Sequence, residues 1–513
     1  MRALIVLALL LQTMEIDSFS IGARRKSNVV GRILTGRPHF WSAPTDVIEV
    51  TQEIIPRDSV ATDAIICGGG PAGLLTAIML AQKFPEKKVK VFDRLGPPPS
   101  PNDDDVWSDV ARFYLLGLGG RGQRALTQFG VWDEVEAVST AVVGRKDWSP
   151  GSKEGVERIF SDRPVTTQVL PRDKLVGVLY KHVLDKYLDQ VEVNYGFEVT
   201  PIDFAAGDGS EVVVRVTRCA EEDTPSPKFD PEELCNAEEP IVLTTNLLIS
   251  ADGTSRTIAN QMEEDDKVER TAMNPIQRLF AGKPFTVTRY KDDNQRVYKS
   301  VPFNVPKGWR QDLNYSARTE GSRVTLEALP ADRGGSYCGI LLMRADDSLA
   351  APNADPVEFR RFFQEELPQF NDLVEDETMA SIAKKPPSFL PGFRYVSPRL
   401  NQGDRTVLLG DCAHTVKPYF GLGCNSALED VVYLSEAIDA TDNLSEAVHL
   451  FSKQRAPEAV ALVKVSRELD RPGKLGFITF ILPIILDSIF HKLAPKLFEP
   501  NNIQMLQRTG YSF

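Results

Sequence analysis

The stretch Cys67-Gly68-Gly69-Gly70-Pro71-Ala72-Gly73 decides the fold of this chain. A short apolar run at 64–66 precedes it and a longer one at 74–81 follows it, an order that predicts a strand, a glycine turn and a helix. Gly68, Gly70 and Gly73 have the spacing of a dinucleotide-binding fingerprint. In that fingerprint the first glycine permits the tight turn, the second lets the backbone approach a pyrophosphate, and the third lets helix and strand pack closely.

The helix after the turn presents free N–H groups and the positive end of its dipole to phosphates. A second predicted strand at 89–92 ends in Asp93, whose carboxylate can accept a hydrogen bond from a ribose hydroxyl. Asp93 lies slightly beyond the usual spacing because the loop at 83–88 is long. The sequence therefore predicts dinucleotide binding, and a glycine turn in an unrelated α/β domain is the alternative.

Composition narrows the class of protein. The 513 residues are 42% hydrophobic and 25% charged, which is ordinary for a globular protein of two or more domains. The net charge of −12 argues against nucleic acid as a partner. The cysteines have no spacing typical of a metal site and the five histidines form no cluster, so we expect reduced thiols and no catalytic metal.

Residues 1–45 are predicted to be a targeting leader rather than part of the fold. Arg2 precedes an apolar segment at 3–11 that is too short to span a bilayer. The stretch that follows lacks acids from Ser18 until Asp46 and contains Arg24, Arg25, Lys26, Arg32 and Arg37. A signal segment followed by a transit-like segment resembles the two-part plastid leaders of algae with secondary plastids. We therefore expect a plastid location, with a secretory or mitochondrial leader as alternatives.

The rest of the chain divides into four predicted segments. A nucleotide-binding segment at 60–264 is followed by a substrate-side segment at 265–395, where alternating runs at 323–330 and 337–343 predict an antiparallel sheet. Nucleotide-binding character returns at 396–445, and 446–513 is predicted to be helical. Within this last segment the apolar stretch 475–498 is predicted to pack on the body, to cover the active site or to lie on a membrane surface.

Further elements are predicted from apolar periodicity and from charge. We expect helices starting at 121 and spanning 170–187, 357–367 and 426–438, strands at 191–199, 211–216, 241–249 and 406–409, and an exposed hairpin insertion at 220–240.

Three motifs follow one another along the chain: the glycine fingerprint, Asp252-Gly253, and Gly410-Asp411 with the loop Pro418-Tyr-Phe-Gly-Leu-Gly-Cys-Asn425 behind it. This order resembles the FAD-dependent aromatic-ring monooxygenases with a single FAD-binding domain, over roughly residues 60–500. Within that family the chain looks most like the kynurenine 3-monooxygenases. The resemblance implies an α/β FAD-binding domain of the Rossmann-like, glutathione-reductase type, with an inserted antiparallel-sheet substrate domain and a helical C-terminal region.

The resemblance also implies the reaction. NAD(P)H would reduce FAD, molecular oxygen would add to give a flavin hydroperoxide, and an aromatic small molecule would be hydroxylated. A single dinucleotide fingerprint is visible, so NADPH is expected to bind transiently on a groove rather than in a domain of its own.

Side-chain chemistry and the resemblance together assign the cofactor site. Asp411 can accept from a ribityl hydroxyl, and Gly421 and Gly423 leave room for the isoalloxazine ring. A helix starting near Asn425 can aim backbone N–H groups at the flavin edge that becomes negative on reduction. His414 is expected to be structural rather than catalytic. The predicted cofactor-binding residues are Gly68, Gly70, Gly73, Asp93, Arg121, Arg172, Asp252, Gly253, Asp411, Pro418, Gly421, Gly423 and Asn425.

The predicted substrate residues are Arg145, Phe160, Tyr419 and Phe420. Kynurenine enzymes hold the substrate carboxylate with an arginine, two tyrosines and an asparagine. The arginine corresponds to Arg145, whereas Phe160, Leu469 and Asn502 stand near the other three positions. The Asp-Gly motif also departs from the family, with Arg256 early and Ala259 where an arginine is usual.

Three of the four residues that hold the substrate carboxylate in kynurenine enzymes are absent here, so several functions remain as alternatives. One is a hydroxylase for a more apolar aromatic substrate. The others are a flavin-dependent reductase or epoxidase acting on an isoprenoid-like substrate, and a non-catalytic flavin-binding protein.

Overall fold

The computed structural model describes residues 60–107, 114–161, 164–204, 211–219, 240–291 and 294–470. The predicted leader, nearly all of the predicted insertion at 220–240 and the apolar stretch 475–498 lie outside these ranges, and their structures stay predictions. Among the helices in the described ranges, none is long and apolar enough to cross a membrane.

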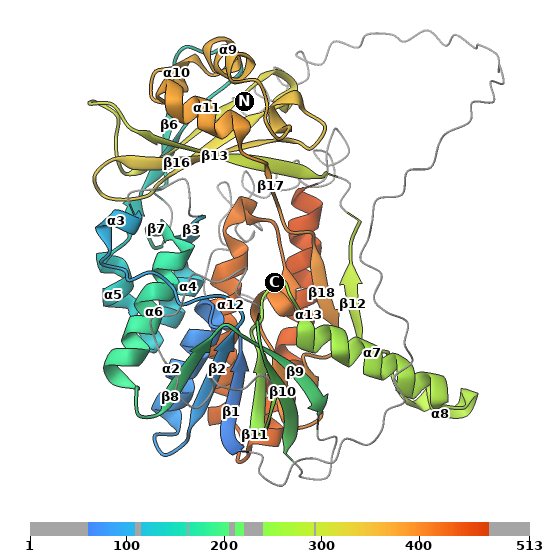
Figure 1. The fold of residues 1–513 in the computed structure, drawn as a ribbon. Helices are drawn as coiled ribbons and strands as arrows, with labels where there is room; N and C mark the ends of the chain where they lie inside the picture. The colour runs from blue at the N-terminus through green and yellow to red at the C-terminus, as the bar shows by residue number, and fades with distance from the viewer. Residues whose placement is uncertain are drawn as a thin grey trace, which may run out of the picture. The chain divides into compact units, whose positions relative to one another are not determined.

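A largely parallel sheet carries the glycine turn (Figure 1). Its order is β19-β20-β11-β1-β2-β8, and β10 and β9 extend it from β11 as antiparallel strands. Ile65 and Ile66 of β1 are fully buried, as expected for a strand covered on both faces. The strands are β1 (Val60–Cys67), β2 (Val89–Asp93), β8 (Val191–Tyr195), β9 (Phe197–Asp203), β10 (Val212–Arg218), β11 (Ile241–Ser250), β19 (Asn401–Gln402) and β20 (Thr406–Leu408).

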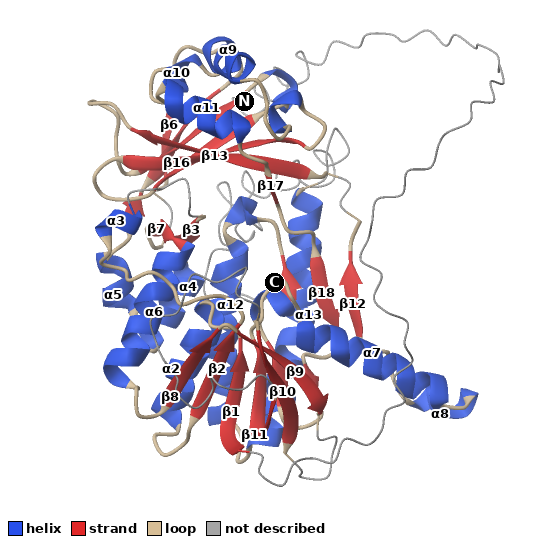
Figure 2. Cartoon of the chain, viewed as in Figure 1, coloured by secondary structure: helices blue, strands red, loops and turns tan. Residues whose placement is uncertain are grey.

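Helices cover this sheet (Figure 2). The helix after the glycine turn, α2, contacts α6 and α12, and α12 also contacts α4 and α13. This coverage explains why α2 is apolar on every face, with Leu74, Leu75 and Ile78 fully buried. The helices of this part are α2 (Pro71–Lys83), α3 (Asp104–Trp107), α4 (Gly120–Gln128), α5 (Trp132–Ala137), α6 (Arg172–Lys186), α12 (Leu422–Asp439) and α13 (Leu444–Leu469).

A seven-stranded sheet forms the second half of the fold, in the order β17-β13-β16-β15-β14-β5-β6. One face packs on three helices through a core that contains Trp148, Tyr315, Phe359 and Phe370. The opposite face is called the inner face below. The elements are β5 (Gly144–Trp148), β6 (Val156–Ile159), β13 (Arg296–Asn304), β14 (Leu313–Arg318), β15 (Thr325–Pro330), β16 (Ser336–Arg344), β17 (Ser388–Phe389), α9 (Pro356–Glu366), α10 (Pro368–Asn371) and α11 (Asp376–Lys384).

Two small sheets and a helical arm complete the described part. The first sheet has the order β12-β18-β21 and the second β3-β7-β4. The elements are β3 (Leu115–Leu118), β4 (Thr140–Val142), β7 (Thr167–Pro171), β12 (Thr286–Arg289), β18 (Arg394–Ser397), β21 (His414–Thr415), α7 (Thr257–Ala272), α8 (Pro275–Phe280) and the short 3₁₀ helices η3 (Glu320–Ser322), η4 (Ser348–Ala350), η5 (Gly410–Cys412) and η6 (Pro418–Phe420).

The structure corrects three details of the sequence-based expectations. The predicted strand at 191–199 is two strands, because Gly196 turns the chain at φ +82°. The substrate-side sheet takes β5 and β6 from outside 265–395, and β5 pairs with β14 in parallel, so the sheet is mixed rather than antiparallel. The helix predicted at 426–438 begins earlier, at Leu422, because Gly421 starts it with φ +62°.

Candidate cofactor and substrate site

The three glycines of the fingerprint have three different surroundings. Gly68 has φ +107°, and a Cβ there would overlap the carbonyl oxygen of Ala251. A Cβ on Gly73 would overlap the carbonyl oxygen of Gly68, so this glycine allows helix and strand to touch. A Cβ on Gly70 would meet nothing nearer than Nη2 of Arg172, at 3.7 Å. Two of the glycines are therefore needed by the fold, and Gly70 leaves open space beside an arginine.

The carboxyl ends of three neighbouring parallel strands bring the three motifs together. Cys67 at the end of β1 pairs with Ser250 at the end of β11, and Ser250 pairs with Leu408 at the end of β20. The residues that follow these strands are the glycine turn, Asp252-Gly253 and Gly410-Asp411. This sheet order brings Gly410-Asp411 beside the first turn, as a single cofactor site that contains both motifs requires.

Arg172 and Asp93 lie on either side of the glycine turn. Arg172 begins α6, donates Nη1 to Asp173 at 2.8 Å and is half-exposed, so its guanidinium stands at the edge of the open space at Gly70. Asp93 ends β2, and its carboxylate accepts the N–H of Gly69 at 2.7 Å and that of Leu95 at 2.8 Å. An ionised carboxylate has about four lone-pair sites, so Asp93 can still accept from a ribose hydroxyl.

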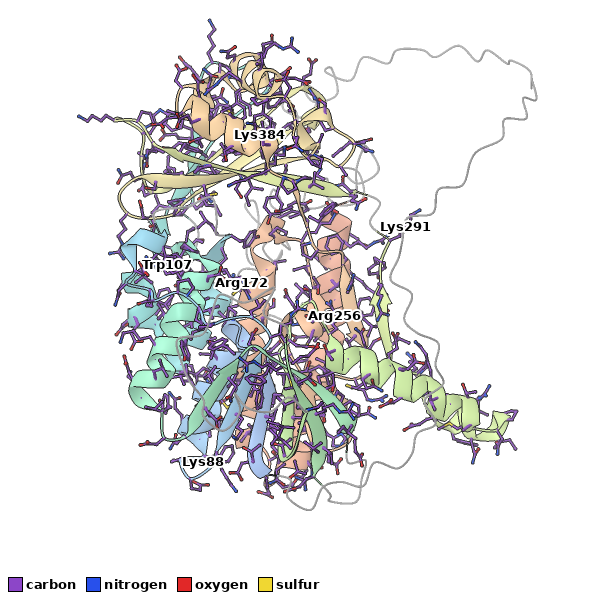
Figure 3. The ribbon with its side chains drawn as sticks, viewed as in Figure 1. Lys88, Trp107, Arg172, Arg256, Lys291 and Lys384 are labelled. Atoms are coloured by element: carbon purple, nitrogen blue, oxygen red, sulfur yellow. The ribbon has the colours of Figure 1, made fainter. Side chains whose placement is uncertain are left out.

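Arg256 joins the second motif to the third, a role that the sequence did not indicate. It caps the start of α7 in the left-handed region, at φ +56°, and is almost fully buried. Its Nη2 donates to the carbonyl oxygen of Asp411 and to the hydroxyl of Thr415. Arg172 and Arg256 lie at the same end of the parallel sheet (Figure 3). Burial raises the pKa of the Asp411 carboxyl, although both arginines oppose that rise.

Asp252 has a structural role in the second motif. Its carboxylate accepts from the hydroxyl of Ser250 at 2.7 Å and from the N–H of Thr257 at 2.6 Å. Burial raises its pKa. The adjacent Gly253 has φ +62°, a conformation that favours glycine. These contacts shape the turn between β11 and α7, and a direct contact between Asp252 and a cofactor stays a prediction.

The start of α12 is a helix N-terminus without a side-chain cap, so backbone N–H groups of its first turn are available to a ligand. Gly423 lies in this turn, where a Cβ would approach Asp411 Oδ1 to 3.8 Å and Val416 to 3.5 Å. Pro418, Tyr419 and Phe420 form the short helix η6 directly before it. The predicted loop thus places Gly423 next to Asp411 and Gly421 near the carbonyl oxygen of Gly117.

Asn425 contributes its side chain in a way that the sequence did not predict. Its Oδ1 accepts the N–H groups of Gly119 at 2.9 Å and Gly122 at 3.2 Å. Its Nδ2 donates to the carbonyl oxygens of Gly117 at 2.8 Å and Gly421 at 2.6 Å. Asn425 therefore fastens the turn between β3 and α4 to the start of α12. These four hydrogen bonds use both lone pairs of the amide oxygen and both N–H groups of the amide nitrogen.

A buried group of charges lies behind the third motif. Arg121 pairs with Glu429, so this predicted cofactor residue holds α4 against α12. Asp430 accepts the N–H of Gly410 at 2.7 Å and bonds Nε2 of His414 at 2.8 Å. Its other oxygen accepts from Nε of Arg455 at 2.9 Å. His414 is thus a structural residue, as expected, and Asp430 fixes both ends of the Gly410–His414 segment.

The residues present fit FAD. The open space at Gly70 and the uncapped start of α2 suit a pyrophosphate, with Arg172 beside it. Asp411 and the uncapped start of α12 suit the ribityl chain and the polar edge of a flavin. An extended dinucleotide has a pyrophosphate and a flavin to bind. The uncapped starts of α2 and α12 offer backbone N–H groups for these two parts.

Tyr114 connects the cofactor residues to the seven-stranded sheet. Burial raises the pKa of its hydroxyl, and Tyr298 and Asp411 act on it in the same direction, so all three lie within electrostatic reach. Tyr298 belongs to β13, where it alternates with the core residues Val297 and Val301 and hence faces the inner side. The inner face is therefore the side of this sheet from which Tyr298 acts on Tyr114.

Arg145 lies on β5 and is already paired. Its Nε donates to Asp147 at 2.6 Å and its Nη2 lies 3.5 Å from Glu327. Glu327 also accepts from the hydroxyl of Ser316 at 2.8 Å. Burial raises the pKa of Glu327, and Arg145 opposes that rise.

Phe160 follows β6, and its N–H donates to the carbonyl of Val143. Whether Arg145, Phe160, Tyr419 or Phe420 touches a substrate stays a prediction.

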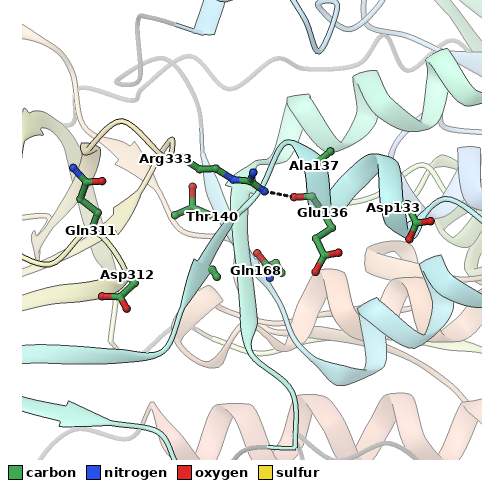
Figure 4. Close-up of a pocket in the computed structure, with 9 residues that line it drawn as sticks. Asp133, Glu136, Ala137, Thr140, Gln168, Gln311, Asp312 and Arg333 are labelled. Carbon is green, nitrogen blue, oxygen red and sulfur yellow. Dashed lines mark hydrogen bonds between the residues drawn. The ribbon is translucent and has the colours of Figure 1, made fainter.

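A surface hollow lies elsewhere, beside α5, β4 and the loop before β14 (Figure 4). Its acidic residues Asp133, Glu136 and Asp312 give it a charge unsuited to phosphates. Arg333 closes one side by donating to the carbonyl oxygens of Ser139 at 2.9 Å and Glu136 at 2.7 Å. None of the predicted site residues lines it, so the hollow is separate from the cofactor site.

Comparison with known proteins agrees with this geometry. A model of the FAD binding domain matches residues 389–464. The kynurenine 3-monooxygenase of Salinispora arenicola is 26% identical over 444 residues, covering 85% of this chain and 86% of that enzyme. The enzyme of that name from Xanthomonas campestris is 25% identical, covering 87% of this chain and 88% of the relative. The chain is therefore similar to kynurenine 3-monooxygenases over most of its length. Both the resemblance drawn from the motifs and the predicted enzyme class, an oxidoreductase, are confirmed.

Solved structures share the fold. A probable FAD-dependent monooxygenase from Pseudomonas aeruginosa superposes with a TM-score of 0.53 at 16% identity, covering 80% of this chain and 96% of that one. The p-nitrophenol 4-monooxygenase of Pseudomonas putida also gives 0.53 at 16% identity, covering 88% and 96%. The expected α/β architecture is thereby confirmed at the level of its mixed sheets and helices.

The glycine surroundings predict two different mutant phenotypes. Gly73→Ala forces a methyl group onto a backbone oxygen and should cost at least about 1–3 kcal/mol of stability. Gly70→Ala, whose site has room, should keep the wild-type melting temperature but weaken FAD binding about tenfold or more, because the methyl group occupies the space for the pyrophosphate. Thermal unfolding of the apoprotein and an FAD titration separate these effects. Wild-type FAD affinity in Gly70→Ala would contradict the assignment.

Asp430→Asn should destabilise the protein by about 3–5 kcal/mol, because it leaves Arg455 buried without its charged partner. The matched control is Asp439→Asn on the same helix, whose carboxylate is exposed and pairs with Lys83, and which should cost less than about 1 kcal/mol. Denaturant unfolding measures both. Equal losses of unfolding free energy in the two variants would show that the buried carboxylate of Asp430 contributes no more stability than the exposed carboxylate of Asp439.

The same carboxylate predicts an acid-dependent loss of stability. Burial alone would raise the pKa of Asp430, but the charges of His414 and Arg455 outweigh it and lower the pKa to about 2. Its contribution is complete above the ordinary value of 3.8 and is lost as the pH falls from there toward about 2. Unfolding titrations over this range should show a smaller loss in Asp430→Asn than in the wild type.

Proposed function

We propose that the protein is an NAD(P)H- and O2-dependent flavin monooxygenase that hydroxylates an aromatic small molecule. The observation that carries the proposal is the convergence of the glycine turn, Asp252-Gly253 and Gly410-Asp411 at one edge of the parallel sheet. The names of the homologues, kynurenine 3-monooxygenases, support the reaction class.

The chain's own residues bind and orient in this proposal. The start of α2 and Arg172 would hold the pyrophosphate, Asp93 the adenosine ribose, and Asp411 the ribityl chain. The positive start of α12 would stabilise the flavin edge that gains negative charge on reduction, and would so favour the reduced cofactor. When bound, FAD supplies the redox and oxygen-transfer chemistry.

The inner face provides the substrate side. Its residues alternate with those of the aromatic core, and they include Tyr298, Ile340 and Leu342 on adjacent strands β13 and β16. Apolar and aromatic side chains of this kind suit a flat ring and exclude water from the reacting atoms. Arg145, Glu327 and Ser316 add a polar group farther along the same face.

The ion pairs of Arg145 bear on the substrate class. An arginine that recognises a carboxylate needs free N–H groups for a bidentate contact. In this chain Asp147 and Glu327 already neutralise it. We therefore propose an aromatic substrate that needs no carboxylate. Kynurenine itself is the second candidate, favoured by the names of the homologues.

A substrate screen tests the proposal. Purified holoenzyme is mixed with kynurenine, its decarboxylated analogue and neutral phenols, and NADPH oxidation and product mass are followed. We expect faster NADPH oxidation and a product that has gained one oxygen atom with at least one substrate lacking a carboxylate. If kynurenine alone is hydroxylated, the substrate class is wrong and the reaction class stands. Product formation without oxygen would instead favour a reductase, and bound FAD that NADPH cannot reduce would favour a non-catalytic protein.

Glu327→Gln tests the role of the paired arginine. The amide removes one negative charge beside Arg145, so the affinity for a carboxylate-bearing aromatic such as kynurenine should rise by up to about fivefold, and that for its decarboxylated analogue should not. Glu157→Gln is the control, because Glu157 pairs with Lys146 on the other side of β5. Ligand titrations monitored by flavin absorbance measure the change. Equal affinities in all three proteins would place Arg145 outside the substrate site.

A further inference from the structure

The helical arm formed by α7 and α8 has an apolar end. Figure 1 shows α7 leading away from the parallel sheet, with α8 at its outer end. α7 contacts β9 and β12, whereas α8 contains no buried residue. The exposed fractions of Ile276, Leu279 and Phe280 are 71%, 79% and 81%. Residues three and four apart share one side of a helix, so these three side chains form one apolar patch, called the arm patch below.

Basic residues surround the arm patch. Between Glu269 and Asp292 the sequence contains no acidic residue. Arg270 and Arg289 pair with acids of α7, but no acidic side chain in the described ranges pairs with Arg278 or Lys283. Both of these cations adjoin the arm patch in sequence. A chain of net charge −12 therefore presents a local positive end at its apolar patch.

The end of the arm is held in shape before any partner binds. Asn274 and Gln277 form a reciprocal capping box at the start of α8. Arg278 donates Nε to the carbonyl oxygen of Arg270 at 2.8 Å and Nη2 to that of Thr271 at 3.2 Å, which fastens α8 to the end of α7. Little conformational entropy remains to be lost when the arm patch binds.

We propose that the arm patch docks the protein on an anionic lipid surface, with Ile276, Leu279 and Phe280 in the interface and Arg278 and Lys283 at the headgroups. A stable protein partner usually covers about 800 Å² on each side, more than one short helix presents. Interfacial binding needs less, because apolar burial and attraction to anionic headgroups add together. Four acids of α7, at 263–266, lie about 9–14 Å back along the helix from its end at Ala272, and Glu269 is the acid of α7 nearest to the arm patch.

Vesicle binding by the full-length holoprotein tests the docking surface. Wild type should co-sediment with vesicles of phosphatidylcholine and phosphatidylserine, less with phosphatidylcholine alone, and less at high salt. The triple variant Ile276→Ser/Leu279→Ser/Phe280→Ser should lose about tenfold or more of the partitioning. Lys283→Gln should lose roughly fivefold on the anionic vesicles. Arg278→Gln should lose at least as much, because it also removes the hydrogen bonds that fasten α8 to the end of α7.

The matched control is Val357→Ser/Phe389→Ser, which removes two other exposed apolar side chains, of 76% and 64% exposure, and should bind like wild type. A Phe280→Trp variant gives a direct readout, since its emission should shift to the blue on vesicle binding. The proposal is overturned if wild type ignores anionic vesicles. It is equally overturned if the triple variant binds as well as wild type, which would assign binding to another segment. A change in sedimentation of the triple variant without lipid, with no vesicle binding by wild type, would make the partner a second copy of the chain.

Discussion

The Asp430 carboxylate is the constraint on which the flavin end of the site depends. One oxygen takes the N–H of Gly410 and the ring of His414, and the other takes Arg455. A buried ion loses several kcal/mol of hydration, so it is tolerated only when all of its partners are present. The geometry of the Gly410–His414 segment is therefore set from behind, by α12 and α13, rather than by the loop itself. The side chain of Asp411 is oriented by its own backbone, whose carbonyl oxygen accepts a hydrogen bond from Arg256.

The sequence predicted those features of the fold and the candidate site that depend on short-range geometry. The roles of Gly68 and Gly73 follow from backbone contacts that any residue with a Cβ would break, and Asp411 follows a buried strand. The strands and helices with clear periodicity were found nearly to their ends. The start of α12 was missed by a few residues, because Gly421 begins the helix through its left-handed conformation, which composition does not reveal.

The long-range charge network could not be predicted in the same way. Glu429 and Asp430 stand between the apolar runs 427–428 and 431–434 of α12, which was the one local sign that buried cations must meet them. Their partners, Arg121 and Arg455, are far away in sequence and have no fixed spacing. The strand β5 was missed as part of the substrate-side sheet because Gly-Arg-Lys-Asp-Trp has none of the apolar alternation by which strands are recognised. The same charged strand carries Arg145, so the least predictable strand is also the one that bears on specificity.

The cluster around Asp430 forms late in synthesis, because its residues lie far toward the C-terminus. The glycine turn is made early, but Gly410, Asp430 and Arg455 emerge from the ribosome only after most of the chain. The strand β20, which places Gly410 beside the first turn, also pairs late with β11. Contacts of such sequence separation close slowly. The residues assigned to the ribityl chain and the flavin are therefore added after those assigned to the pyrophosphate, and the whole cofactor site is assembled only in a chain that has been completed through α13.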